Sequence, residues 1–465
     1  MTSAVSRYRK PFTSVPEQAR LLASRGLDIG TIDAAETLLR RHGYYRLSGY
    51  SHFYRVRDAN GLVLDRFRTG STLRDVVRLH EADSRLRQTL LRGLATLEIA
   101  LRFHVGHRLG RRAAFAHRAP EHVGDEFRTW RAGISDGIAR SRHHEWLRDY
   151  TAQERRAQDQ FVSHFRRKYG PHLPVWASTE VMSLGTLSRL YEGMQENDQK
   201  LIAARFGVLS RTGDGDSSVF ANWLNHLRHV RNIAAHHGRL WNRTLDVALS
   251  IPSTLPELAH LQEPAPRKVY GTGAVLRFLL ARVDRGSNWH EGFTEALRGL
   301  SGGDAISPRD FGAHDEWASE HIWSRSYDAD DELIRIADAI DEVDVVNTPQ
   351  ARALLTARAK PSDKKSWLRY LTSNNALIAL RIGPQTYYPA FQFGTSDVDP
   401  VVADINEILF RELPDRGSPA LRAVDVQRWW LTPSPDPAMS DSPLTRLASS
   451  PDAVRAEALR VGGGS

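Results

Sequence analysis

Residues 73–110 read LRDVVRLHEADSRLRQTLLRGLATLEIALRFHVGHRLG, and this stretch decides the fold of the chain. Its apolar side chains recur near the three- and four-residue spacing that places them on one face of a helix. They include Leu90, Leu94, Leu97, Ile99, Leu101 and Val105. We therefore predict a long helix here, broken at most once, as the centre of a mainly α-helical fold.

Helical patterns continue on both sides of this stretch as far as residue 300. We predict one helix at 14–24 and another at 31–43, which Thr31 or Asp33 caps and Gly43 ends. The helices predicted after the long one cover residues 140–169, 175–194, 198–206, 217–237, 273–285 and 289–300, the first of them charged and exposed. The one strand pattern in this part is a hairpin over 53–67, because Asn60-Gly61 favours a tight turn.

The segment Ser301-Gly302-Gly303-Asp304 is the best candidate for a domain boundary, because composition and charge both change there. We predict a helical domain over 1–300 and a smaller, mostly helical domain over 304–461. The smaller domain is expected to contain one β-hairpin, formed by 376–382 and 387–393 around Gly383-Pro384. Its predicted helices cover residues 330–341, 348–357, 366–373, 400–413, 423–431 and 451–460.

Composition limits where the protein works and what it binds. The 465 residues include no cysteine, which excludes disulfides and thiolate metal sites and fits a reducing cytoplasm. No apolar run approaches the roughly 20 residues that a membrane helix needs, and the first residues lack the apolar core of a secretion signal. We therefore expect a cytoplasmic protein with no membrane partner.

Charge is distributed unequally along the chain. Residues 301–465 contain 17 basic and 25 acidic residues, a net charge of −8, against +16 for residues 1–300. A basic front part suits a polyanionic partner, most simply a nucleic acid. An acidic rear part could shield that surface or bind elsewhere. The alternative is that charge merely varies along a two-domain protein, and the charges alone favour neither interpretation.

The residues with the clearest chemistry are RNIAAHHGRLWNR at 231–243, which combine three arginines, two asparagines and two histidines. Histidine changes charge near neutral pH and can take a proton from an RNA 2′-hydroxyl. Arginine offers a permanently charged, planar fork to phosphate oxygens. Arg231 and His236 are therefore the candidate catalytic pair for metal-free RNA cleavage, with Asn232 as an orienting group. The candidate RNA-binding residues are Arg228, Arg239, Asn242 and Arg243.

A helix over 217–237 makes the two adjacent histidines unequal. His237 falls on the apolar stripe and is predicted to pack, whereas His236 falls on the polar stripe and is the better candidate for proton transfer. Arg231 and His236 lie about 140° apart on an ideal helix, so one helix cannot easily aim both at one phosphate. We expect a two-fold homodimer to bring both residue types into one cleft. The alternative is a buried Arg–Asn–His network that only ties helices together.

Two histidine-containing groups could be mistaken for metal sites. In His143-His144-Glu145, adjacent histidines point about 100° apart on a helix and chelate poorly, so a solvated charged helix is favoured. For Glu320-His321, too, we favour a solvated charged segment over a metal site. The sequence contains no metalloprotease motif, no phosphate-binding loop of the Walker type and no dinucleotide glycine pattern. We expect neither a metal nor a cofactor.

Four ordered blocks of the front part resemble the abortive-infection (Abi, AbiD/AbiF-like) family, a branch of the HEPN superfamily, over about residues 7–290. The blocks are YYRLSGY at 44–50, LEIALR at 97–102, PVWA at 174–177 leading to EVMSLGTLS at 180–188, and LNHLRHVRN at 224–232. The resemblance implies a HEPN-like helical bundle, often dimeric, with a role in phage defence or toxin–antitoxin systems. It also implies that an R-x4-6-H motif, here Arg231 and His236, can act as a metal-independent endoribonuclease.

The rear part is similar, more faintly, to MbcA/ParS/Xre-type antitoxin domains. The matching blocks are TPQARALL at 348–355, LIALR at 377–381, YPAFQF at 388–393 and WWLTP at 429–433. This similarity implies a domain that neutralises a toxin, through an intramolecular contact or a protein partner, although residues 435–441 depart from the usual pattern. The sequence thus favours a defence effector that cuts RNA under the restraint of a fused domain. The alternative is a non-catalytic module that binds RNA or protein.

Overall fold

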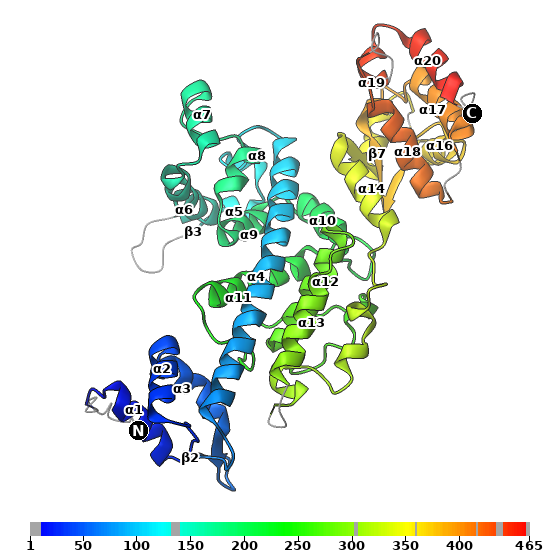
Figure 1. Ribbon diagram of the computed structural model, residues 1–465. Helices are drawn as coiled ribbons and strands as arrows, with labels where there is room; N and C mark the ends of the chain where they lie inside the picture. Colours follow the sequence, from blue (N-terminus) through cyan, green and yellow to red (C-terminus); the bar gives the residue numbers. More distant parts are fainter. Residues whose placement is uncertain are drawn as a thin grey trace.

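A computed structural model of the chain describes residues 11–131, 140–301, 306–358, 360–414, 417–433 and 440–461. The fold is mainly α-helical, as predicted, and is organised around α4, Leu73–Gly110, which runs through the whole front part (Figure 1). The predicted long helix is confirmed at both ends and has no break. The Thr72 hydroxyl accepts the Asp75 amide at 3.0 Å, and the Asp75 carboxylate accepts the Thr72 amide at 3.2 Å. This capping box fixes where α4 begins.

An N-terminal lobe packs against the first half of α4 through α3. Its helices are α1 Val15–Ser24, α2 Ile32–His42 and α3 Tyr44–Ser51. The cap predicted at Thr31 is confirmed, because its side chain accepts the amide of Ala34. Gly43 ends α2 at a φ of 81°, a left-handed conformation that turns the chain directly into α3. The predicted hairpin is also confirmed, as β1 Arg55–Arg57 paired with β2 Val63–Phe67.

The segment after α4 corrects two predictions. The exposed helix expected at 140–169 is two helices, α6 Arg142–Arg156 and α7 Gln160–Tyr169, and α6 buries Trp146 and Tyr150 completely. The helix expected at 175–194 is interrupted, because Met182 is extended. The remaining elements are α5 Asp125–Arg128, α8 Val175–Ser178, α9 Leu184–Gly193, α10 Glu196–Arg205, and the unpredicted strand pair β3 Trp130–Arg131 and β4 Arg140–Ser141.

Three further helices complete the front bundle around α4. They are α11 Ser217–Ala235, α12 Val269–Val283 and α13 Trp289–Leu300. Every residue of α12 from Val269 to Arg282 is buried, so this helix forms the interior of the bundle and contacts α4, α11 and α13. No helix in the described part of the chain has both the length and the apolar character needed to cross a membrane.

The front core continues beyond the boundary predicted at 301–304, of which residues 302–304 lie outside the described residues. Short 3-10 turns at Pro308–Phe311, Trp317–Ser319 and His321–Trp323 follow α13. The side chains of Phe311, Trp317 and Trp323 are buried in the same apolar cluster as the front helices. A second apolar cluster takes over from α14 onward. The proposed division into 1–300 and 304–461 remains a prediction.

The C-terminal part is a small sheet surrounded by helices. Its helices are α14 Asp331–Glu342, α15 Thr348–Leu354, α16 Pro361–Ser373, α17 Pro400–Glu412, α18 Pro419–Leu431, α19 Pro443–Arg446 and α20 Pro451–Arg460. The predicted hairpin is confirmed as β6 Leu380–Ile382 and β7 Gln385–Pro389. A strand that the sequence did not reveal, β5 Val345–Asn347, pairs with the other edge of β7.

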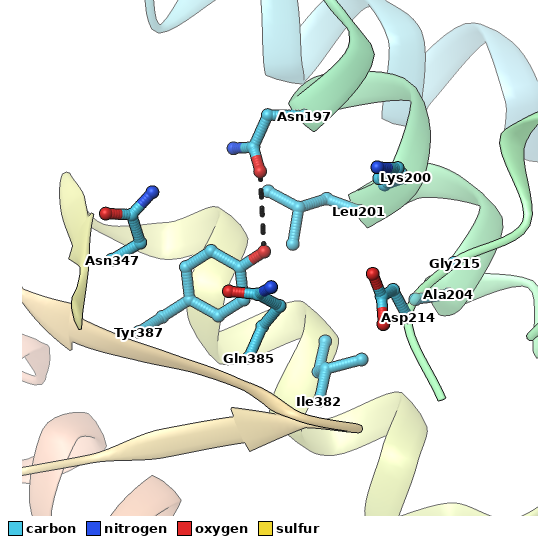
Figure 2. Close-up of a pocket in the computed structure, with 10 residues that line it drawn as sticks. All are labelled: Asn197, Lys200, Leu201, Ala204, Asp214, Gly215, Asn347, Ile382, Gln385 and Tyr387. Carbon is cyan, nitrogen blue, oxygen red and sulfur yellow. Dashed lines mark hydrogen bonds between the residues drawn. The ribbon is translucent and has the colours of Figure 1, made fainter. Parts of the chain in front are cut away.

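A charged seam joins this C-terminal part to the front bundle. Arginines of the front bundle meet aspartates of α14 and the residues beside it, in the pairs Arg108–Asp341, Arg111–Asp344, Arg205–Asp338 and Arg285–Asp331. A cavity of about 140 Å³ lies along the seam between α10 and the β6–β7 hairpin (Figure 2). There the Tyr387 hydroxyl donates to Asn197 at 3.4 Å. Opposite charges of the two parts therefore form ion pairs where the parts meet.

Candidate functional site

The end of α11 departs from the predicted helix and shapes the candidate site. The helix stops at Ala235, two residues early, and His236 is its C-terminal cap. The amide of Gly238 donates to Ile233 at 2.8 Å and the amide of His237 donates to Ala234 at 3.0 Å, which together form a Schellman motif. A Cβ at Gly238 would lie 2.8 Å from the Ile233 side chain, so the close approach requires glycine. The chain therefore turns sharply just after His236.

The Schellman motif overturns the role predicted for His237. Its φ of 57° places it in the left-handed region, where histidine is uncommon but more frequent than most residues. Its side chain is exposed instead of packed, because the turn removes it from the apolar stripe. The rest of that stripe is as predicted, since Trp223, Leu227 and Val230 are buried. The adjacent histidines are thus both exposed, and only the backbone distinguishes them.

A buried carboxylate fixes the chain that follows this turn. Asp83 of α4 is fully buried and accepts the amides of Leu240 at 3.2 Å and Trp241 at 2.9 Å. It also accepts the Tyr50 hydroxyl at 2.7 Å and forms an ion pair with Arg87. Burial raises the pKa of Asp83, and the charge of Arg87 and the hydrogen-bond donors oppose that shift. All of these contacts are donors, which is the set that a carboxylate anion requires.

Arginine side chains also bind the carbonyls around the turn. Arg46 of α3 donates to the His237 carbonyl at 2.8 Å, and Arg239 donates to the Gly49 carbonyl. The end of a helix carries partial negative charge on its free carbonyls, which repels phosphate. Cations at this end offset that charge. Beside Arg46, Tyr45 is 91% exposed and presents an aromatic ring to solvent.

The proposed catalytic residues lie at the surface at the end of α11. Arg231 is half-buried, and Asn232 and His236 are exposed. Within the described part of the chain, their side chains form neither a hydrogen bond nor an ion pair. They are therefore not the buried helix-tying network that was the structural alternative. Their role in catalysis, and the dimer that would combine them, stay predictions.

The four predicted RNA-binding residues divide by their contacts. Arg228 is half-buried and donates to Asn225 at 2.6 Å, and Arg239 is held by the Gly49 carbonyl described above. Asn242 is half-buried, and its backbone carbonyl accepts Lys268 at 2.9 Å. Arg243 is exposed, and its side chain has no hydrogen bond or ion pair among the described residues. Arg228 and Arg239 thus have structural contacts that an RNA ligand would share or replace.

Several supporting residues were not identified from the sequence. Asp83 and Arg87 lie far from the 231–243 motif in the chain, and no spacing rule connects them; Tyr50 lies in the YYRLSGY block, but nothing there links it to Asp83. His226 had a signal, because it lies within the LNHLRHVRN block. It is fully buried, with Nδ1 2.7 Å from the Val247 carbonyl and Nε2 2.8 Å from the Thr272 hydroxyl. Burial lowers the pKa of His226 to about 4, so it is a neutral structural residue that ties the loop after the motif to α12.

No group of three or more histidines and carboxylates in the described ranges is arranged to hold a metal ion. His143, which the sequence analysis set aside as a ligand, is buried with Nε2 2.9 Å from the His117 carbonyl. Its ring stacks on Trp146. His143 is therefore a buried structural residue and only His144 is exposed, which corrects the solvated helix that we predicted there.

Residues 37–242 match the family model of Abi-like proteins. The match begins in α2 and ends one residue before Arg243, so this Abi-like segment contains α11, the turn at 236–238 and the Asp83 contacts. It supports the Abi resemblance over a shorter range than 7–290 and does not extend to the C-terminal part. No curated protein and no solved structure matches the chain. The HEPN subtype and the antitoxin-like domain remain predictions.

Proposed function

We propose that this chain is an abortive-infection effector in phage defence, and that the end of α11 binds and cleaves RNA without a metal ion. The match of the Abi-like segment supports the biological role. The observation that carries the chemistry is that the half-buried Arg231 and the exposed His236 both lie at the end of α11, with side chains that have no hydrogen-bond or ion-pair partner among the described residues. Because no contact among the described residues holds these side chains, both are available to a ligand.

In the proposed reaction, the His236 imidazole takes the proton of an RNA 2′-hydroxyl. The 2′-oxygen then forms a bond to the adjacent phosphorus, and the bond from phosphorus to the 5′-oxygen breaks. The leaving 5′-oxygen takes a proton from water, and the resulting hydroxide takes the proton held by His236, so the products are a 2′,3′-cyclic phosphate and a 5′-hydroxyl. Arg231 stabilises the negative charge that develops on the phosphate oxygens, and Asn232 orients the histidine or the phosphate.

The surroundings of the turn fit an RNA ligand. Arg46, Arg239 and the exposed Arg243 place positive charge beside a helix end that would otherwise repel phosphate. Tyr45 offers an exposed ring on which an unpaired base can stack. Because an ideal helix places residues 231 and 236 about 140° apart, we propose that a second copy of α11 completes the site in a homodimer.

The C-terminal part is placed too far away to cover this site directly. It contacts α4 at Arg108 and Arg111, whereas the turn after α11 contacts α4 at Asp83. The 25 residues from Asp83 to Arg108 span about 37 Å at the rise of about 1.5 Å per residue of an α-helix. Restraint by this antitoxin-like domain would therefore need a route other than steric cover, such as a change at the charged seam or a protein partner.

Incubation of the full chain with RNA in excess EDTA tests the proposal. The wild-type protein should produce fragments that end in 2′,3′-cyclic phosphate, and Arg231→Ala and His236→Ala should lose about 100-fold or more of the rate. Arg85→Ala, an exposed arginine elsewhere on α4, is the matched control and should cut normally. RNA binding without products from the wild type would instead support the competing function, a non-catalytic RNA-binding module.

A further inference from the structure

The C-terminal part contains a second cationic site that the proposed nuclease does not use. A groove of about 730 Å³ opens between α15, α16, the β6–β7 hairpin and the start of α18. Four basic side chains line it, and no carboxylate does. These side chains are Arg352, Lys365, Arg369 and Arg381. This is unexpected in a part of the chain that carries a net charge of −8.

The cations of this groove have no acidic partner among the described residues. In the described residues, none of the four forms an ion pair, and the Nε of Arg352 is buried without a hydrogen-bond partner. The Nε of Arg381 donates to the Gly383 carbonyl at 2.8 Å. Lys365 and Arg369 are exposed. A buried guanidinium nitrogen without an acceptor costs free energy, so the groove is suited to a ligand that supplies anionic oxygens.

The floor and the size of the groove identify the kind of anion. The buried side chains of Leu368, Leu377, Tyr388 and Phe410 form its apolar floor, and its lining also includes hydroxyl side chains such as Thr372 and Thr386. The volume lies in the usual range for small-molecule sites, roughly 300–1,000 Å³. A long polyanion would leave this apolar lining unused, because its contacts would be with the cations alone. A small ligand with a flat apolar body and several phosphates matches both the lining and the cations.

We propose that the C-terminal groove binds a nucleoside polyphosphate. The base would lie on the floor beside Tyr388, and Arg352, Lys365 and Arg369 would hold the phosphates. The inference is independent of RNA cleavage at α11, because the groove is formed by the C-terminal part alone. It gives this part a function of its own, as a receptor for a small ligand.

Calorimetric titration of the full chain with ATP, GTP, CTP and UTP tests this inference. At least one nucleotide should bind. If ATP is the ligand, adenosine, which lacks the phosphates, and inorganic pyrophosphate, which lacks the base, should each bind at least about tenfold more weakly than ATP. Lys365→Ala with Arg369→Ala should weaken binding about tenfold or more, because two exposed cations are lost. Arg428→Ala, an exposed arginine outside the groove, is the control and should leave binding unchanged.

Thermal melting of each variant separates binding from folding, since exposed positions should leave the melting temperature unchanged. The inference is overturned if none of the four nucleotides binds, or if binding is unaffected by the double substitution. It is also overturned if a ten-nucleotide RNA binds to the groove more tightly than any mononucleotide, because the site would then belong to RNA. RNA cleavage by the same variants is a separate readout, which tests only the site at α11.

Discussion

At the scale of single residues, the backbone after α11 distinguishes two histidines that look equivalent in the sequence. His236 is the last residue with near-helical geometry, and His237 has a left-handed φ of 57°. A residue with a Cβ costs about 1 kcal/mol or more in that conformation, and glycine does not. The sequence could not show this, because a helical wheel assumes that the helix continues. Because both side chains are exposed, burial does not choose between them, and only the spacing of the R-x4-H motif assigns His236 to Arg231.

His237→Gly should stabilise the protein by about 1 kcal/mol, because it releases left-handed strain without removing a packed side chain. RNA cleavage should continue if His236 is the proton acceptor. Chemical denaturation and the EDTA assay on the same preparation measure both effects. Loss of cleavage in His237→Gly together with retained cleavage in His236→Ala would assign the proton transfer to the other histidine.

At the scale of elements, α4 supplies both the spine of the bundle and the anchor of the site. Its length and ends followed from the apolar spacing of residues 73–110. Its use of Asp83 to hold the amides of residues 240 and 241 did not, since the two segments lie more than 150 residues apart in the chain. The short helix α3 was also missed, although its Tyr50 and Arg46 reach Asp83 and the turn. Such contacts arise only when helices pack.

Asp83→Ala should lower the free energy of unfolding by about 3–5 kcal/mol, because it leaves the buried Arg87 cation without its counter-ion and two amides without an acceptor. It should also reduce RNA cleavage, since the chain after His236 loses its anchor. Urea denaturation measures the first effect. Arg85→Ala, exposed on the same helix, serves as control and should change stability by less than about 0.5 kcal/mol. An equally small change for Asp83→Ala would show that the carboxylate does not hold the loop.

At the scale of the whole molecule, the basic front and acidic rear meet at an arginine–aspartate seam far from the turn that ends α11. The charge difference alone favoured neither a contact between the two parts nor mere variation of charge along the chain. The structure also shows that deleting residues from 304 onward would remove Phe311, Trp317 and Trp323 from the front core. A growth phenotype after such a truncation would therefore not distinguish the loss of restraint from the loss of folding. Variants at the seam or in the groove avoid that ambiguity.

Several histidines that are buried in the neutral state should make the fold sensitive to acid. Burial lowers the pKa of His104 and His117 to about 3 and of His226 to about 4, below the ordinary value near 6.5. The unfolded chain therefore binds more protons as the pH falls below about 6.5, and stability is lost from there down to about pH 3. Above pH 6.5, this contribution to stability is fully present.

Denaturation in urea at pH 7.5, 6.0 and 5.0 checks that dependence. His226→Asn keeps a donor for the Val247 carbonyl but does not titrate, so the loss of stability with falling pH should become less steep. His236→Asn, at an exposed position, should leave the slope unchanged. Parallel slopes for wild type and His226→Asn would mean that carboxylates, and not buried histidines, control the acid response.

The sequence by itself determined the helical class, the course of α4, the C-terminal hairpin and the segment that carries Arg231 and His236. These features follow from apolar spacing, caps and turn residues that act over a few positions of the chain. Only the tertiary structure decided where α11 ends, what anchors the turn, where the two parts meet, and which cations remain free in the C-terminal groove. Those outcomes depend on contacts between residues far apart in the chain, which local spacing does not encode.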